Sequence, residues 1–314
     1  MFNNPAFFAC FAPKDTTSSP KKEQLVVPKM PLKMESLLLI VTGASRGLGK
    51  AIVDVMCLKA SPSLFQVDQI HLILVARSAG RLEKIGREIV QHYEKSTTTI
   101  KLSCHAVDLS ALDKLDANTD RIFQGLDLSN YDRAIFVNNH GSIGSIGPCS
   151  ESPSAQAMND DVQLNVTSCL WLSSRFAKLV QQSQASTTSS YKCKTTLVNI
   201  SSLLAIESFP SMGIYGAGKA ARDHYHRTMA KEIPSDRMKI LNYAPGPLET
   251  DMVTEIRTAP SLDKSLQATF NKKLIEPKNS AWKLIKLLLS PDVSFATGDH
   301  VDYFDLPDDA SDQK

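Results

Sequence analysis

The sequence predicts an α/β fold: one doubly wound parallel sheet of about seven strands, with helices on both faces. Two observations carry this prediction. From Leu37 onward, short apolar runs rich in β-branched residues alternate with longer amphipathic stretches, which is the pattern of repeated strand–helix–strand units. A glycine-rich turn directly follows the first apolar run and leads into an amphipathic stretch, as at the start of many doubly wound sheets.

The apolar runs have the length and composition of strands buried on both faces. In chain order they cover residues 37–42, 71–76, 101–107, 134–138, 195–201, 238–244 and 295–303. Amphipathic spacing predicts a first helix over residues 48–59 and a long one over about 155–181. The Ser-, Thr- and Gln-rich stretch 181–190 is expected to be a surface loop.

Composition limits the possible functions. The chain has 314 residues, 42% of them hydrophobic, which is enough for one large domain with a buried core. A formal net charge of +2 gives no electrostatic basis for binding nucleic acid. The apolar run 37–41 is too short to span a bilayer. We therefore expect one domain over residues 34–306, with neither nucleic acid nor membrane as a partner; the motifs below point to a small-molecule substrate.

Six cysteines are scattered along the chain, and no two form a Cys-x-x-Cys pair. This pattern is typical of reduced thiols and disfavours a zinc site, so it predicts a cytoplasmic location and no metal.

Residues 1–33 lack helical periodicity and are expected to be disordered, the alternatives being a transit peptide or a later start at Met30 or Met34. A flexible tail is expected over residues 307–314.

A phosphate-binding turn is predicted after the first strand, in the sequence Thr-Gly-Ala-Ser-Arg-Gly-Leu-Gly. Gly43 lets the chain turn tightly, Gly47 permits close approach to a pyrophosphate, and Gly49 lets the helix pack closely on the strand. The phosphate would meet free N–H groups and the positive end of the helix dipole. The predicted cofactor contacts are Gly43, Ala44, Ser45, Arg46, Gly47, Leu48 and Gly49.

Two arginines favour NADPH as the cofactor. Arg46 lies inside the turn, and Arg77 with Ser78 ends the second strand, where an NAD-selective site usually carries a carboxylate. A guanidinium suits a 2′-phosphate because it forms forked, charge-assisted hydrogen bonds. The alternative is that Arg77 is an ordinary solvated surface cation.

Polar residues after the third and fourth strands extend the predicted cofactor site. Asp108 is placed to accept a hydrogen bond from adenine, and Leu109 to pack on its ring. Alternatively, Asp108 caps the next helix with Ser110. Asn138 begins the segment Asn-Asn-His-Gly, whose backbone is expected to pass beside the cofactor at Gly141.

A proton-transfer group is predicted near the middle of the chain. Tyr215 and Lys219 are four residues apart and so share a helix face. A free phenol has a pKa of about 10, and the charge of Lys219 is expected to lower it. Ser202 directly follows the fifth strand, where its hydroxyl can hold a substrate oxygen.

Asn165 lies within an otherwise apolar helical stretch, and a buried amide needs partners. It either bends the helix by bonding to backbone or supports a water chain to Lys219, and both roles are compatible.

Residues 258–278 interrupt the strand–helix pattern. This segment is expected over the C-terminal edge of the sheet, as a lid or as a passive surface helix.

Taken in this order, the motifs T-G-x-x-x-G-x-G, N-N-x-G and Y-x-x-x-K, with Asn165 and Ser202, resemble the short-chain dehydrogenase/reductase family over roughly residues 37–305. The resemblance implies a single Rossmann-type domain and an NAD(P) cofactor. It also implies a catalytic tetrad of Asn165, Ser202, Tyr215 and Lys219, and a homodimer formed through the helices that carry Asn165 and Tyr215. His140 departs from the family pattern, which has alanine there; its ring would crowd the cofactor or point away.

Residues 199–203, 215–223, 242–252 and 298–305 resemble more narrowly the sepiapterin reductases of this family. This implies NADPH-dependent reduction of side-chain ketones of a pterin, ending in tetrahydrobiopterin. It also implies that Asp302 anchors the pterin, since a carboxylate can accept its N–H and amino group together; the alternative is a solvated Asp302. Further implied contacts are Leu203 and Gly246 with substrate, and Leu248, Thr250, Asp251 and Met252 with cofactor. The rival functions are a carbonyl reductase for another ketone or aldehyde, and a non-catalytic NADP-binding scaffold.

Overall fold

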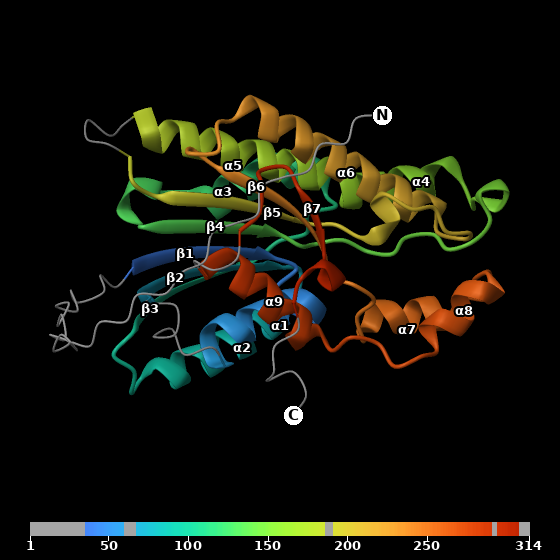
Figure 1. Ribbon diagram of the computed structural model, residues 1–314, viewed down its shortest axis with the longest axis horizontal. Coiled ribbons are helices and arrows are strands. Elements are labelled where there is room, and N and C mark those ends of the chain that lie inside the picture. The colour runs from blue at the N-terminus through green and yellow to red at the C-terminus, as the bar shows by residue number, and fades with distance from the viewer. Residues whose placement is uncertain (1–34, 60–66, 186–190, 291–293, 308–314) are drawn as a thin grey trace, which may run out of the picture. The chain divides into compact units, whose positions relative to one another are not determined.

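The computed structural model describes residues 35–59, 67–185, 191–290 and 294–307. The expected N-terminal extension, loop residues 186–190 and tail residues 308–314 lie outside these ranges. The described part of residues 33–314 contains a 7-stranded sheet with the order β3-β2-β1-β4-β5-β6-β7 (Figure 1). Every neighbouring pair is parallel, which confirms the predicted fold class.

The elements follow the predicted alternation. The strands are β1 (Glu35–Thr42), β2 (Val67–Ala76), β3 (Thr99–Ala106), β4 (Arg133–Asn138), β5 (Lys194–Ile200), β6 (Lys239–Ala244) and β7 (His300–Asp302). The α-helices are α1 (Gly47–Asp54), α2 (Ala79–Tyr93), α3 (Leu112–Phe123), α4 (Ala155–Val162), α5 (Ser168–Ala185), α6 (Gly213–Glu232), α7 (Asp251–Thr258), α8 (Lys264–Phe270) and α9 (Pro277–Leu289). Two π-helical turns continue or join helices, at Val55–Lys59 and Gln163–Thr167.

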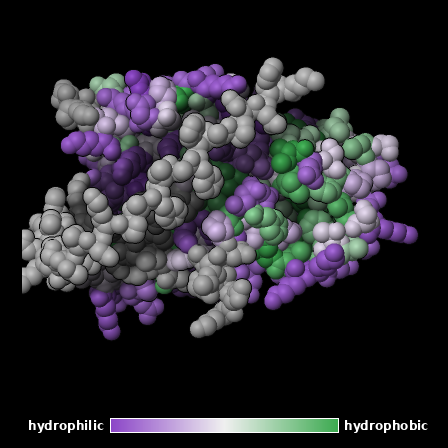
Figure 2. Space-filling view, in the orientation of Figure 1, coloured by the Kyte–Doolittle hydropathy of each residue, from purple (hydrophilic) through white to green (hydrophobic). Residues whose placement is uncertain are grey.

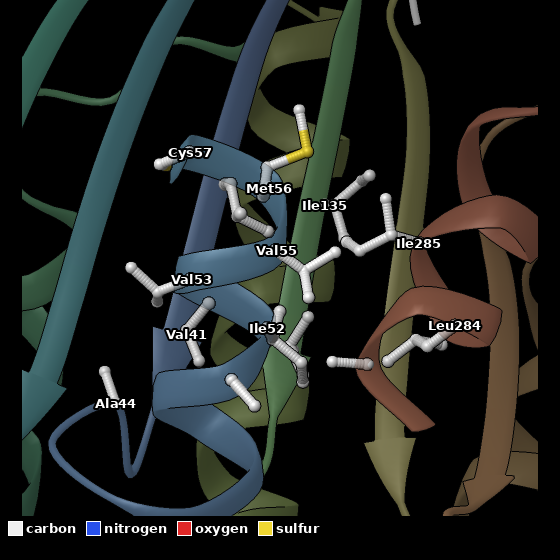
Figure 3. Packing of buried hydrophobic residues seen from close by; sticks show 14 of the residues in the cluster. Val41, Ala44, Ile52, Val53, Val55, Met56, Cys57, Ile135, Leu284 and Ile285 are labelled. Carbon is white, nitrogen blue, oxygen red and sulfur yellow. The ribbon is translucent and has the colours of Figure 1, made fainter. Parts of the chain in front are cut away.

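Apolar side chains cover both faces of the sheet, because alternate residues of each strand point to opposite sides. One hydrophobic cluster joins the sheet to α1, α2 and α9, and a second joins it to α3, α5 and α6 (Figure 1). In the first cluster, Ile52 and Val55 lie beside Ile135 of β4 and Leu284 of α9 (Figure 3). Each fully buried aliphatic side chain stabilises the fold by about 1.5–3 kcal/mol, so the two clusters hold the strand ends at fixed positions.

Two predicted boundaries were wrong. The last strand is restricted to His300–Asp302 instead of residues 295–303, because Gly298 has a φ of +91° that interrupts the extended backbone. The helix α5 runs to Ala185, so residues 181–185 are not a loop. Ser183 holds this helical end in place, since its hydroxyl accepts a 3.0 Å hydrogen bond from the backbone N–H of Leu128.

The segment 258–278 contains the end of α7, all of α8 and the start of α9. Its residues Leu266, Thr269 and Phe270 line a cavity at the carboxyl ends of the strands, which confirms the expected placement over that edge. Among the described residues, no helix combines a bilayer-spanning length with the apolar composition that such a span requires.

Candidate active site

The carboxyl ends of the strands open into a cavity of about 970 Å³, within the size range of small-molecule sites. Its walls come from the segments that follow β1 to β6, from α7 and α8, and from β7 with the short helix after it. Ligands of doubly wound sheets bind at this edge, where the strand order changes direction. The order β1-β4 around the first strand places that change beside the glycine-rich turn.

The glycine-rich turn has the geometry of a phosphate cradle. Gly43 and Gly47 have φ values of +65° and +54°, which favour glycine. A Cβ atom on Gly49 would lie 2.3 Å from the carbonyl oxygen of Gly43, so turn and helix pack without room for a side chain. Ser45, Arg46 and Leu48 line the cavity with the first two glycines, whereas Ala44 and Gly49 are absent from its lining.

The first turn of α1 is left open to an anion. Its N-cap residue, Arg46, makes no side-chain capping bond, and the first turn contains no acidic residue. Uncapped N–H groups at the positive end of a helix bind phosphate well. The turn therefore fits the pyrophosphate of a dinucleotide.

Three arginines line the adjoining part of the cavity: Arg46, Arg77 and Arg81. Sequence reasoning missed Arg81, although its position three residues after Ser78 predicts it in the first turn of the next helix. That turn begins at Ser78, whose hydroxyl accepts the N–H of Arg81. Arg46 also forms a 3.1 Å ion pair with Asp251, which is well exposed and so contributes at most about 1 kcal/mol.

Asp108 and Leu109 both line the cavity, as predicted for adenine contacts. Burial raises the pKa of Asp108, but hydrogen bonds from Ser110 and the charge of Arg77 outweigh burial and lower it. The alternative that Asp108 caps the next helix was wrong, because the N-cap of α3 is Ala111 and makes no side-chain bond. Asp108 instead closes a local turn with the N–H and hydroxyl of Ser110.

Asn138, an expected cofactor contact, does not line the cavity. It is fully buried, and its amide donates to the carbonyl oxygen of Cys169 and to Ser173. The residues that line the cavity are its successors Asn139, His140 and Gly141. The side chain of Asn139 donates a 2.9 Å bond to the carbonyl oxygen of Thr42, which joins this segment to the glycine-rich turn.

The His140 ring is bound inside the protein, where the family resemblance implies alanine. Its Nδ1 lies 3.0 Å from the Thr42 hydroxyl and its Nε2 lies 2.7 Å from the Ser168 hydroxyl. Because Ser168 donates its proton to the carbonyl oxygen of Leu164, Nε2 of His140 must be the donor to Ser168. Burial, with the charges of Arg222 and Lys219, holds the pKa of His140 well below its usual range.

Ser202, Tyr215 and Lys219 line the same cavity as the glycine-rich turn. The Ser202 hydroxyl accepts a 3.2 Å bond from the N–H of Leu204, which leaves its own proton available to a substrate oxygen. Lys219 is buried, and its ammonium donates a 2.6 Å bond to the carbonyl oxygen of Ile200. Its Nζ atom lies 5.5 Å from the centre of the Tyr215 ring.

The expected lowering of the Tyr215 pKa was wrong for this structure. Burial raises the pKa of the phenol to about 12, and the opposing charge is that of Arg222. Burial, followed by the charge of Arg222, also lowers the pKa of Lys219 well below its usual value. The reason is that desolvation disfavours the charged form of each group, and at Tyr215 it outweighs the charge of Arg222.

Asn165 does not line the cavity. It lies in the π-helical turn between α4 and α5. Its side-chain oxygen accepts a 2.9 Å bond from the N–H of Ser142, which agrees with the interpretation that it bonds to backbone. Single π-turns of this kind often accompany functional sites. Asn165 thus positions the segment that carries His140 and Gly141.

The expected substrate end contains Leu203, Gly246 and Asp302, all in the cavity lining. One carboxylate oxygen of Asp302 accepts the N–H of Phe304 at 3.0 Å, and Asp305 accepts the N–H of Asp302 at 2.8 Å. Sequence reasoning missed most of the apolar walls, which are contributed by Phe209, Met212, Ile256, Leu266 and Phe270 together with the expected contact Met252. Figure 2 shows hydrophobic side chains gathered on this face between α6 and α7.

Comparisons with known proteins agree with this geometry. A family model described as short chain dehydrogenase matches residues 38–261. Sepiapterin reductase of Xenopus tropicalis is 30% identical over 275 residues, which cover 86% of this chain and 97% of that protein. Sepiapterin reductase of Bos taurus is 31% identical, with coverages of 85% and 94%. Benzil reductase of Bacillus subtilis is 27% identical, with coverages of 72% and 80%.

Solved structures share the fold. An alcohol dehydrogenase from Thermococcus sibiricus, in complex with 5-hydroxy-NADP, has a TM-score of 0.60 at 20% identity, covering 85% of this chain and 96% of its own. A 3-ketoacyl-(acyl-carrier-protein) reductase from Brucella melitensis, in complex with NADH, has a TM-score of 0.62 at 18% identity, with coverages of 85% and 96%. The two complexes show that this fold accepts both kinds of nicotinamide cofactor.

Proposed function

This chain belongs to the short-chain dehydrogenase family, and we propose that it is an NADPH-dependent carbonyl reductase acting on side-chain ketones of a pterin, that is, a sepiapterin reductase. The observation that carries the proposal is the single cavity shared by Ser202, Tyr215 and Lys219, the glycine-rich turn and Asp302. The reaction would form part of the route to tetrahydrobiopterin.

The chain's own residues act on the carbonyl oxygen, while bound NADPH supplies the hydride. Burial raises the pKa of Tyr215 to about 12, so the phenol is protonated at neutral pH and donates its proton to that oxygen. Ser202 donates a hydrogen bond to the same oxygen as negative charge develops there. Lys219 and Asn165 support the return of a proton to the phenol, and Lys219 would also bind the ribose of the cofactor.

The preference for NADPH is supported by charge. Arg46, Arg77 and Arg81 line one end of the cavity, and the second strand ends without the carboxylate that would bind ribose hydroxyls. A 2′-phosphate would meet two or three guanidinium groups there, each able to form charge-assisted hydrogen bonds.

The choice of a pterin is supported by Asp302. Its carboxylate accepts the N–H of Phe304 and, in a capping box, the N–H of Asp305. An ionised carboxylate has about four lone-pair sites, which leaves acceptor capacity for a ligand. Apolar walls such as Phe209 and Phe270 suit a flat heteroaromatic ring, while the carboxylate binds its N–H edge. Sequence similarity to two sepiapterin reductases at 30–31% identity points the same way.

The test measures NADPH oxidation with sepiapterin and with benzil, in the wild type and in Asp302→Asn. This substitution keeps an oxygen for the N–H of Phe304 and removes the charge. We expect kcat/KM for sepiapterin to fall about tenfold or more, and the benzil value to change less than about threefold. The control is Asp299→Asn, an exposed carboxylate of the same segment outside the cavity lining.

The same measurements separate the rival functions. Equal losses for both substrates, or turnover of benzil alone, would favour a general reductase of ketones and diketones, for which the similarity to a benzil reductase is the supporting observation. NADPH binding without turnover of any carbonyl compound would favour a non-catalytic scaffold.

We also propose a homodimer in the cytoplasm. The exposed Met158 and Val162 of α4 lie on the helical segment that leads into the turn with Asn165, and a dimer would cover apolar surface of this kind. Light scattering on the purified chain tests the dimer, and a monomer at micromolar concentration would contradict it.

A further inference from the structure

A row of polar side chains crosses the sheet beneath the cavity. Asn138 of β4 is in register with Asn199 of β5, which is in register with Asn242 of β6 and then with His300 of β7. The three asparagines are fully buried. Burying amides is costly unless each is hydrogen-bonded, and none of these residues has a part in the proton transfer described above. This buried polar row therefore needs a function other than proton transfer.

Arg222 of α6 joins this row from the helix side. Its guanidinium is fully buried and forms three hydrogen bonds. Nε donates to the side-chain oxygen of Asn199 at 2.8 Å, and the two terminal nitrogens donate to the carbonyl oxygens of Asn138 at 2.8 Å and His140 at 3.2 Å. One planar group thus binds two strands and the turn that follows β4, a geometry that a lysine ammonium cannot reproduce.

The charge of Arg222 is not cancelled by an ion pair. Its acceptors are neutral, and no salt bridge to Arg222 occurs within the described residues. The neighbouring carboxylate, Asp223, instead accepts the amide of Asn199 at 3.0 Å and lies 2.6 Å from Nδ1 of His300. A buried cation bound only by dipoles acts strongly on nearby titratable groups.

Arg222 lies on the catalytic face of its helix. It follows Tyr215 by seven residues and Lys219 by three, spacings that place all three side chains on one side of α6. Its carbonyl partners belong to the segment whose Asn139 binds the glycine-rich turn. Arg222 therefore connects the helix of the proton donor to the cofactor cradle.

We propose that Arg222 is a positioning residue of this site: it locks the turn after β4 to α6 and supplies a permanent positive charge beneath Tyr215 and Lys219. The expected effect of Arg222 on turnover rests on the proposed reductase function, whereas its expected effect on the titration of Lys219 does not. Consistent with it, the charge of Arg222 lowers the pKa of both Tyr215 and Lys219, after the larger effect of burial on each.

Other titratable groups also face Lys219 and remain in every variant used below. They are Tyr215 and Asp223 of α6, Cys169 of α5 and His140 after β4.

The test follows Lys219 and turnover separately in two variants. Lysine side chains labelled with ¹³C at Cε report protonation by NMR, and the Lys219 signal is identified by its loss in Lys219→Arg. Arg222→Gln removes the charge and should raise the titration midpoint of Lys219 by about one pH unit or more. Arg222→Lys keeps the charge but not the three-way bond, and should leave the midpoint within about half a unit while kcat falls at least about tenfold.

The control is Arg227→Gln, which removes an exposed cation from the same helix and should change neither quantity. An unchanged Lys219 midpoint in Arg222→Gln, or wild-type turnover in Arg222→Lys, would overturn the proposal, even if stability fell. If Arg222→Gln does not fold, Arg222→Lys alone tests the proposal: the titration midpoint of Lys219 should be retained while turnover is lost. A wild-type chain that reduces no carbonyl compound would refute the proposed function, and the midpoints would then decide the electrostatic part alone.

Discussion

The ammonium nitrogen of Lys219 lies 5.5 Å from the centre of the Tyr215 ring and donates its 2.6 Å hydrogen bond to the carbonyl oxygen of Ile200. The lysine is thus anchored to the end of β5, the strand that Ser202 follows. This contact fixes the proton-transfer helix relative to the strand end, so that the two hydroxyl groups lie in one cavity.

Tyr215→Phe removes the proton donor but keeps the ring. We expect kcat for carbonyl reduction to fall by about 10²–10⁴-fold, with NADPH affinity changed little because the cradle is intact. Steady-state kinetics and fluorescence titration of NADPH measure the two quantities. Tyr225→Phe, on the same helix but outside the cavity lining, is the matched control. Wild-type turnover in Tyr215→Phe would contradict the assigned role.

Arg77→Ala should weaken NADPH selectively. Loss of charge-assisted hydrogen bonds to a 2′-phosphate is expected to lower kcat/KM for NADPH by about tenfold or more, since such bonds contribute about 1.5–3 kcal/mol, while NADH is affected little. The comparison needs both cofactors with one carbonyl substrate. Arg87→Ala removes an exposed arginine of α2 that does not line the cavity, and it should leave the cofactor ratio unchanged. Equal losses with NADPH and NADH would count against a 2′-phosphate site.

Gly49→Ala tests the packing of the glycine-rich turn. The added Cβ would lie 2.3 Å from the carbonyl oxygen of Gly43 and 2.6 Å from the amide of Asn139. The turn must shift to accept it, so we expect a loss of about 1–3 kcal/mol in the free energy of unfolding and weaker dinucleotide binding. Gly80→Ala is the control, because nothing lies within 4 Å of its added Cβ, and it should be neutral or stabilising. Urea unfolding of both variants decides, and equal stabilities would contradict the prediction.

His226 should make the fold sensitive to acid. Burial is the largest cause that lowers its pKa from 6.5 to about 4. Between pH 6.5 and about 4 the unfolded chain therefore binds a proton at this histidine more readily than the folded chain does. The free energy of unfolding is highest above pH 6.5 and decreases as the pH falls toward 4. One group of this kind contributes about 3 kcal/mol across that window.

The measurement is the urea midpoint of unfolding at several pH values between 7 and about 4.5. In His226→Gln the dependence on pH should be weaker over this window, whatever the stability at pH 7. His224→Gln, an exposed histidine of the same helix, should leave the wild-type slope. A slope in His226→Gln identical to that of the wild type would show that another group is responsible.

Local patterns were sufficient to predict most of the fold. Strand-length apolar runs and the glycine-rich turn predicted the parallel sheet, because side-chain periodicity is a property of neighbouring residues. The shared helix face of Tyr215 and Lys219 followed from their spacing, and Ser202 from its position after a strand. These residues meet because parallel strands all end at one edge of the sheet.

Features that depend on distant segments were missed. Arg222 was not singled out, because a sequence does not show that its guanidinium meets the carbonyl oxygens of Asn138 and His140 more than 80 residues away. The apolar wall residues Ile256 of α7 and Leu266 and Phe270 of α8 were missed for the same reason. Asn138 was expected among the cofactor contacts but does not line the cavity, because the motif does not show that Cys169 and Ser173 bind its amide in the interior.

The sequence by itself determined which chemical groups stand at the strand ends and in what order. Only the tertiary structure decided in which direction their pKa values shift. It raises the pKa of Tyr215 to about 12, where spacing alone predicted a decrease caused by Lys219. The physical reason is that desolvation depends on all the atoms packed around a group, from every segment of the chain, whereas spacing along one helix records only its nearest neighbours.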